Sequence, residues 1–207
     1  MIRELDPVVQ QQFGLPYFEH YDGPGKHYSS QSPIPAEDIP TMVKAAGLPL
    51  DILCSILVVG CASGELVHDL VCLGYNAFGI DISSYALARA DSNIEGRLYH
   101  MDAERLLIFP EDTFTVTVAN MVPHVDPSRM VTWLTELRHI SAICVYLRYI
   151  TKEWAEDYHA KYHSESYRLH IPWAESEEWW AGIFDQASLT IAHRVDDDDC
   201  CSRVVLV

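Results

Sequence analysis

The sequence lacks any apolar run near the roughly 18 to 20 residues that a membrane-spanning helix requires. Its N-terminus, MIRELDPVVQQQ, also lacks the basic and then apolar stretch of a signal peptide. We therefore expect a cytoplasmic protein with no membrane partner.

Basic residues are scarce. The 207 residues hold 14 Lys and Arg against 30 Asp and Glu, so the formal net charge is -16 with His neutral. A surface of this sign repels a phosphate backbone over most of its area. The composition therefore disfavours a nucleic-acid partner, and it says nothing about the oligomeric state.

Metal-binding spacings are also missing. The six cysteines include no C-x-x-C pair and no zinc-type spacing with His, so we interpret them as reduced thiols. His159 and His163 stand four residues apart with His170 nearby, which leaves a metal site open as an alternative. The four consecutive Asp at 196–199 lack the rest of a calcium-loop pattern and favour a solvated turn. We predict no metal.

Strand-like and helix-like segments alternate through the middle of the chain. Residues 52–59 form a nearly continuous apolar run, typical of a strand buried on both faces. Helical spacing follows over 65–73, and Gly74 can end that helix. The later elements alternate likewise: a strand ending at Ile80, a helix opened by Ser83 or Ser84, strands at 97–101 and 114–119, a helix begun by Asp126 and Pro127, and a strand at 143–149.

This order predicts an α/β fold with a doubly wound, mostly parallel, Rossmann-like sheet. Two strand-like runs, 189–195 and 200–207, end the chain with only a turn between them, so the sheet should end in an antiparallel hairpin. We expect an N-terminal arm or lid over 1–35 and one domain over 36–207. An aromatic-rich insertion at 152–182 is the expected substrate side, with Trp179 and Trp180 in its core-facing part.

A loop of small residues, Gly60-Cys61-Ala62-Ser63-Gly64, lies between the first strand and the following helix. Small side chains allow a polar ligand to approach the backbone closely. At this position the ligand would meet backbone amides and the N-terminus of the following helix. A dinucleotide fingerprint needs glycines at the first, third and sixth positions, but the third position from Gly60 is Ala62 and the sixth is Glu65. A nicotinamide-linked oxidoreductase is therefore a remote alternative.

The segment ILVVGCASGELV resembles the first motif of the class I S-adenosylmethionine-dependent methyltransferases, and three further segments follow in that family's order. These are AFGIDISSYALARA, YHMDAERL and TFTVTVANMVPHV. Within the class, YFEHYDGPGKHYSS and HIPWAESEEWWAGIF look most like the stand-alone bacterial and phage enzymes with type 11 or type 23 domains.

The resemblance implies that S-adenosyl-L-methionine is the cofactor. It implies ribose binding by Asp81 beside Ile82, and contact of Asp102-Ala103 with the adenine. Asn120 is expected at the amino-acid end of the cofactor or at the substrate, and Tyr28 in a lid over the sulfonium. With the loop, the expected cofactor-binding set is Gly60, Cys61, Ala62, Ser63, Gly64, Asp81, Ile82, Asp102, Ala103, Asn120 and Tyr28. The lid role of Tyr28 is argued from the aromatic side chains of the arm, and an arm packed on the sheet edge is the alternative.

The reaction implied is methyl transfer to an oxygen or nitrogen nucleophile of a small molecule or sugar. His124, just after the fourth strand, is the candidate base, and a structural His is the alternative. Val58, Ala62 and Pro123 depart from the family's usual Asp, Gly and Glu. They leave open an inactive, cofactor-binding partner subunit. The Ala62 methyl is expected to narrow the approach to the methionine part of the cofactor.

Overall fold

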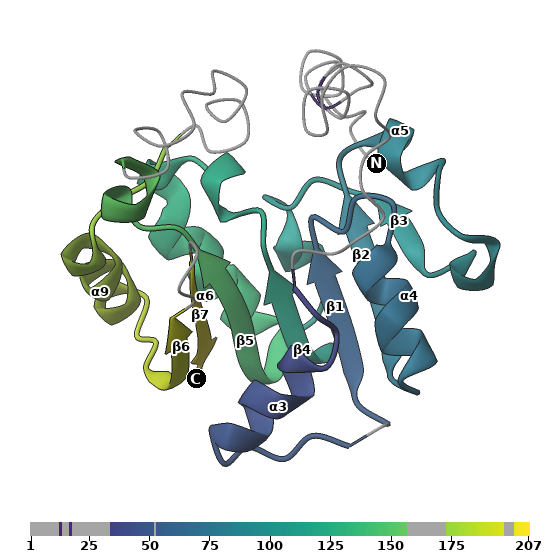
Figure 1. Ribbon diagram of the computed structural model, residues 1–207, viewed down its shortest axis with the longest axis horizontal. Helices are drawn as coiled ribbons and strands as arrows, with labels where there is room; N and C mark the ends of the chain where they lie inside the picture. Colours follow the sequence, from purple (N-terminus) through teal and green to yellow (C-terminus); the bar gives the residue numbers. More distant parts are fainter. Residues whose placement is uncertain (1–12, 14–16, 18–33, 52, 157–172, 197–200) are drawn as a thin grey trace.

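The computed structural model describes residues 13, 17, 34–51, 53–156, 173–196 and 201–207. Helices and strands alternate through this part of the chain as the sequence predicts (Figure 1). The first half contains α3 (Asp38–Ala45), β1 (Ser55–Val59), α4 (Glu65–Cys72), β2 (Asn76–Asp81), α5 (Ser84–Leu87), η1 (Ser92–Ile94) and β3 (Leu98–His100). The second half contains η2 (Leu106–Ile108), β4 (Phe114–Ala119), η3 (Val122–His124), η4 (Pro127–Arg129), α6 (Met130–His139), β5 (Ser141–Tyr149), α9 (Glu177–Gln186), β6 (Ile191–Asp196) and β7 (Ser202–Leu206).

The strands form one seven-stranded sheet in the order β3-β2-β1-β4-β5-β7-β6. Strands β1 to β5 pair in parallel, whereas β7 pairs antiparallel with both β5 and β6. The predicted parallel sheet with an antiparallel end hairpin is confirmed. The order reverses between β1 and β4, where ligands of doubly wound sheets bind beyond the carboxyl ends of the strands.

Both faces of the sheet are buried, because side chains alternate along each strand. Leu57 and Val59 of β1 belong to the core under α6 and α9, while Ile56 and Val58 belong to the core under α3 and α4. Helices therefore cover both faces (Figure 1). Val58, where the family's first motif usually has Asp, is an ordinary core side chain with 3% exposure.

Several element boundaries differ from the sequence-based expectation. The expected helix after Asp126 begins as the 3-10 turn η4 and becomes α-helical only at Met130, although Asp126 does cap the turn by accepting from the Ser128 N–H at 2.8 Å. The side chain of Trp179 is partly buried rather than fully buried, whereas Trp180 lies in the core. Ser83 is the N-cap of α5, as predicted, and accepts from the Ala86 N–H.

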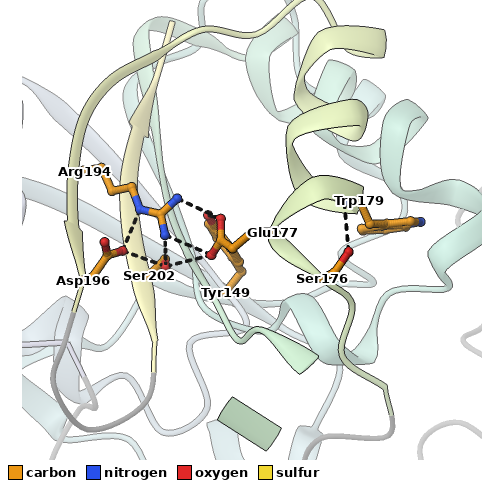
Figure 2. Close-up of polar contacts among 7 residues, drawn as sticks. All are labelled: Tyr149, Ser176, Glu177, Trp179, Arg194, Asp196 and Ser202. Atoms are coloured by element: carbon orange, nitrogen blue, oxygen red, sulfur yellow. Dashed lines mark hydrogen bonds and ion pairs between the residues drawn. The ribbon is translucent and has the colours of Figure 1, made fainter. Parts of the chain in front are cut away.

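A polar network fixes the terminal hairpin to α9 and β5 (Figure 2). The guanidinium of Arg194 donates to both carboxylate oxygens of Glu177, at 2.8 and 2.9 Å, and to Asp196 at 2.6 Å. Tyr149 donates its hydroxyl proton to Glu177 at 3.3 Å, and Ser202 lies within the same network. Burial, followed by the negative charge of Glu177, raises the pKa of Tyr149 to about 12.

No helix among the described residues is long and apolar enough to cross a membrane. In the same part of the chain, no group of three or more His, Cys, Asp or Glu side chains is placed to hold a metal ion. His159, His163 and His170 lie outside the described residues.

Candidate functional site

The loop between β1 and α4 owes its shape to three residues with positive φ. Gly60, Ala62 and Gly64 have φ of 74°, 50° and 88°. A Cβ on Gly60 would lie 2.7 Å from the Met121 side chain, and one on Gly64 would lie 2.7 Å from those of Ile94 and Leu98. Glycine is therefore required at both ends of the loop by space as well as by conformation.

The loop is attached to the neighbouring strand by its own amides. The N–H groups of Gly60 and Cys61 both donate to the carbonyl of Ile80 in β2, at 2.9 and 3.0 Å. Cys61 is buried with 5% exposure, close to Gly79, so its side chain is part of the core. Burial also raises the pKa of the Cys61 thiol well above its ordinary value. Any ligand contact of Cys61 must therefore come from its backbone.

Asp81 ends β2 directly beside this loop. Its Oδ2 accepts from the Ala62 N–H at 2.8 Å, and its Oδ1 accepts from the Ser83 N–H at 2.7 Å. Burial raises the pKa of the Asp81 carboxyl, and the two N–H donors offset part of that rise. Each carboxylate oxygen has lone-pair capacity beyond its one backbone partner, so Asp81 is held in place and remains able to accept from hydroxyl groups.

Asp102 and Ala103 follow β3 on the same side of the molecule. Asp102 is half-buried, and its Oδ1 accepts from the Glu104 N–H at 2.9 Å. Ala103 is buried, and its carbonyl accepts from the indole N–H of Trp133 at 2.9 Å. This bond fixes the chain after β3 against α6.

Asn120 and His124 follow β4, on the other side of the loop. The Asn120 side-chain oxygen accepts from a guanidinium N–H of Arg148 in β5 at 3.1 Å. Arg148 was not predicted as a site residue, although it is the only charged residue in the otherwise apolar run 143–149 and could have been recognised by that. His124 ends η3, where its Nε2 lies 3.1 Å from the hydroxyl of Tyr17.

The expected lid is described only at two residues. Phe13 and Tyr17 pack edge-on with a centroid separation of 5.2 Å, and the Phe13 carbonyl accepts from the Ser83 hydroxyl at 2.6 Å. Tyr28 and most of the arm lie outside the described residues, as does most of the aromatic insertion at 152–182. The remaining predicted residues come from the ends of β1, β2, β3 and β4, which share one edge of the sheet (Figure 1).

A fold of this order, with a small-residue loop after β1 and an acid after β2, is the arrangement that the sequence motifs predict. Residues 56–142 match the family model described as a methyltransferase domain. The resemblance of the sequence to the class I S-adenosylmethionine-dependent methyltransferases is confirmed over this region. S-adenosylmethionine is accordingly the cofactor of this methyltransferase, as the sequence predicts.

Solved structures support the fold assignment. A magnesium protoporphyrin IX methyltransferase from Synechocystis PCC 6803, solved with bound S-adenosylmethionine, matches with a TM-score of 0.66 and 16% identity, over 100% of this chain and 99% of that one. An S-adenosylmethionine-dependent methyltransferase from Methanosarcina mazei matches with a TM-score of 0.59 and 18% identity, over 76% and 93%. No curated protein sequence matches this methyltransferase.

A third similar structure was solved in work on the conversion of a disulfide bond into a thioacetal group during echinomycin biosynthesis. It matches with a TM-score of 0.64 and 19% identity, over 86% of this chain and 83% of that one. These identities are low, so the likeness concerns the fold of the methyltransferase.

Proposed function

We propose that this methyltransferase moves the methyl group of S-adenosylmethionine to an oxygen or nitrogen nucleophile of a small molecule or sugar. The observation that carries the proposal is the Asp81 carboxylate, held by the Ala62 and Ser83 N–H groups beside the glycine loop. A partly buried carboxylate with spare acceptor capacity suits a pair of ribose hydroxyls, each of which donates one hydrogen bond.

The other cofactor contacts are assigned by position in the fold. In this proposal the small-residue loop 60–64 lies against the amino-acid part, and Asp81 with Ile82 holds the ribose. Asp102 and Ala103 lie against the adenine, and Asn120 lies near the methionine end. Tyr28, which is outside the described residues, is proposed as a lid residue. The division into an arm at 1–35, a domain at 36–207 and a substrate-side insertion at 152–182 belongs to the same proposal.

The cofactor, when bound, supplies a methyl group already activated by its sulfonium. The protein residues then have two tasks, which are to hold the acceptor in line with that methyl group and to exclude water. The loop and Asp81 occupy the ends of β1 and β2, so the acceptor is assigned to the ends of β4 and β5. His124 lies there and takes a proton from an acceptor that must lose one, while Arg148 holds the Asn120 side chain.

Two observations support a small acceptor. The net charge of -16 disfavours nucleic acid. Two of the similar structures come from small-molecule chemistry, one a methyltransferase of magnesium protoporphyrin IX and the other a protein of echinomycin biosynthesis.

The test combines calorimetry with turnover. S-adenosylhomocysteine, the demethylated product, should bind the full chain in titration calorimetry, and methyl-labelled S-adenosylmethionine should transfer label to members of a panel of phenols, amines and sugars. Each acceptor is paired with its fully methylated form, which has no O–H or N–H left and should take no label. Binding without transfer to any member would favour the inactive partner, and absence of binding would overturn the assignment of the cofactor site.

A further inference from the structure

The backbone around Asp102 is fixed on both sides by hydrogen bonds to other elements. The Met101 N–H donates to the carbonyl of Asp81, at the end of β2, at 2.9 Å. The Ala103 carbonyl accepts from the indole N–H of Trp133 in α6, also at 2.9 Å. Asp102 is therefore held between the residue assigned to the ribose and a helix of the core.

The bond from Trp133 lies inside the protein. Trp133 is fully buried, and Ala103 is buried as well. The indole nitrogen is the one polar atom of the tryptophan side chain and acts only as a donor. A buried donor that loses its acceptor costs free energy, so the Ala103 carbonyl has a strong reason to stay in place. Helix α6 consequently sets the orientation of the peptide group to which this carbonyl belongs.

The same peptide group also holds the carboxylate of Asp102. Its carbonyl belongs to Ala103 and its N–H to Glu104, and this N–H donates to Asp102 Oδ1 at 2.9 Å. A peptide group is planar, so a bond that fixes the oxygen also fixes the direction of the N–H. The bond to the carbonyl also polarises the group and strengthens the N–H as a donor. Trp133 and Asp102 are thus connected through one rigid unit.

The second carboxylate oxygen of Asp102 has a weaker partner. Oδ2 lies 3.9 Å from Nε of Arg105, and both side chains are partly exposed, so this ion pair contributes little. A carboxylate oxygen can accept more than one hydrogen bond, so Oδ2 can still accept from an exocyclic amino group. The Glu104 side chain forms an ion pair with Arg129, directly before α6, which attaches the segment to the same helix a second time.

We propose that Trp133 is a positioning residue that sets the preference of the site for an adenine base, by orienting Asp102 through the peptide group between Ala103 and Glu104. The amino group of adenine donates to the carboxylate, whereas hypoxanthine has a carbonyl oxygen in that place, which a carboxylate repels. The inference rests on the proposed placement of the adenine against Asp102 and Ala103. It adds that base recognition depends on a fully buried residue of α6.

The experiment compares S-adenosylhomocysteine with S-inosylhomocysteine, in which hypoxanthine replaces adenine. Titration calorimetry of the full chain gives the ratio of the two dissociation constants. The wild type should favour adenine by about tenfold or more, because hypoxanthine cannot donate to the charged acceptor. Trp133→Phe keeps an aromatic ring in the core and removes the indole N–H, and it should lower the ratio by about threefold.

Two other tryptophans supply matched controls. Trp180 is also buried, and its indole nitrogen has no hydrogen-bond partner among the described residues. Trp180→Phe therefore tests lost packing alone, and it should lower the melting temperature without changing the ratio. Trp173 donates its indole N–H to the Val125 carbonyl at 2.8 Å, on the acceptor side. Trp173→Phe loses a bond of the same kind in another place and should also leave the ratio unchanged.

Asp102→Ala decides the question even if Trp133→Phe folds poorly, because it changes a partly exposed residue of a loop. It should abolish the preference for adenine, and Trp133→Phe should have no further effect on the ratio in that background. Equal wild-type affinities for the two ligands, or an unchanged ratio in Asp102→Ala, would overturn this inference together with the placement of the adenine.

The role of Trp133 can also fail by itself. An unchanged ratio in folded Trp133→Phe, or an equal fall in Trp180→Phe, would overturn it while the placement of the adenine stands. Absence of S-adenosylhomocysteine binding to the wild type would instead contradict the proposed cofactor site, and this inference with it.

Discussion

Two carboxylates of this methyltransferase, Asp81 and Glu177, are held in opposite ways. Asp81 is partly buried and accepts from two backbone N–H groups, and no ion pair to it is found among the described residues. Glu177 is 40% exposed, and it accepts from both arms of the Arg194 guanidinium and from Tyr149 (Figure 2). One carboxylate is fixed by the backbone, and the other is neutralised by a side chain.

This difference separates a binding site from a structural contact. A bidentate guanidinium occupies both oxygens of a carboxylate and compensates its charge, so little remains for a ligand. Backbone N–H groups orient a carboxylate without placing a full positive charge beside it. We therefore expect changes at Asp81 to act mainly on cofactor affinity and changes at Glu177 to act on stability.

The largest effect is expected from Asp81→Ala. Loss of two hydrogen bonds from ribose hydroxyls to a charged acceptor should weaken S-adenosylhomocysteine binding by roughly 1.5 to 3 kcal/mol. The Ala62 and Ser83 N–H groups also lose their acceptor, so the melting temperature should fall as well. Calorimetry gives the affinity and thermal denaturation the stability. Unchanged affinity in a folded Asp81→Ala variant would remove Asp81 from the site.

Glu177→Gln should lower the stability of the protein and leave its affinity for the cofactor unchanged. The bidentate ion pair with Arg194 becomes at best a neutral contact, and the pair is partly exposed, so the free energy of unfolding should fall by about 1 kcal/mol. Cofactor affinity should stay the same. Glu178→Gln is the matched control, because this neighbouring residue is in the same first turn of α9 and is exposed. Denaturant titration of the two variants checks the prediction, and equal stabilities would show that the network in Figure 2 contributes nothing measurable.

The sequence predicted the parts of this comparison that depend on local patterns. Apolar runs alternating with helical spacing gave the strands, and the small residues around Gly60 gave the loop. Asp81 was found because it ends a strand at the place where the resembling family has its ribose acid, although its two N–H partners could not be foreseen. Placement of β7 between β5 and β6 was also beyond the sequence, since a hairpin can join a sheet by either strand.

Contacts between distant segments were not predictable from residue patterns. Tyr17 and His124 are 107 positions apart, and nothing in either segment specifies the other. The Arg194 to Glu177 pair likewise depends on where the hairpin meets α9. At Ala62 the sequence indicates only an extra methyl group, whereas the structure shows a positive φ, which changes the expected effect of substituting it.

Ala62→Gly should stabilise this methyltransferase by up to about 1 kcal/mol. The sequence alone suggests the reverse, because glycine increases the entropy of the unfolded chain. At a φ of 50°, however, the Cβ of alanine lies too close to the backbone carbonyl oxygen, and glycine removes that strain. Removal of the methyl group should also tighten S-adenosylhomocysteine binding.

Ser188→Gly is the control for Ala62→Gly. Ser188 has φ of 57° and follows α9, in another part of the fold. It should gain stability without a change in affinity. A loss of affinity in folded Ala62→Gly would show that the alanine methyl fits the bound cofactor.

The smallest effect is a dependence of cofactor affinity on pH through Asp81. Burial raises the pKa of this carboxyl, so the folded chain holds its proton at a pH where the unfolded chain has released it. Ionising Asp81 therefore costs stability as the pH rises through that window. Ribose hydroxyls donate to the ionised form, so S-adenosylhomocysteine binding should weaken as the pH falls, by about twofold when the pH equals the pKa. Calorimetry at several pH values at which the protein stays folded measures this slope. Asp81→Asn does not titrate and should bind more weakly with a flatter profile, and an equally steep profile in that variant would assign the dependence to another group.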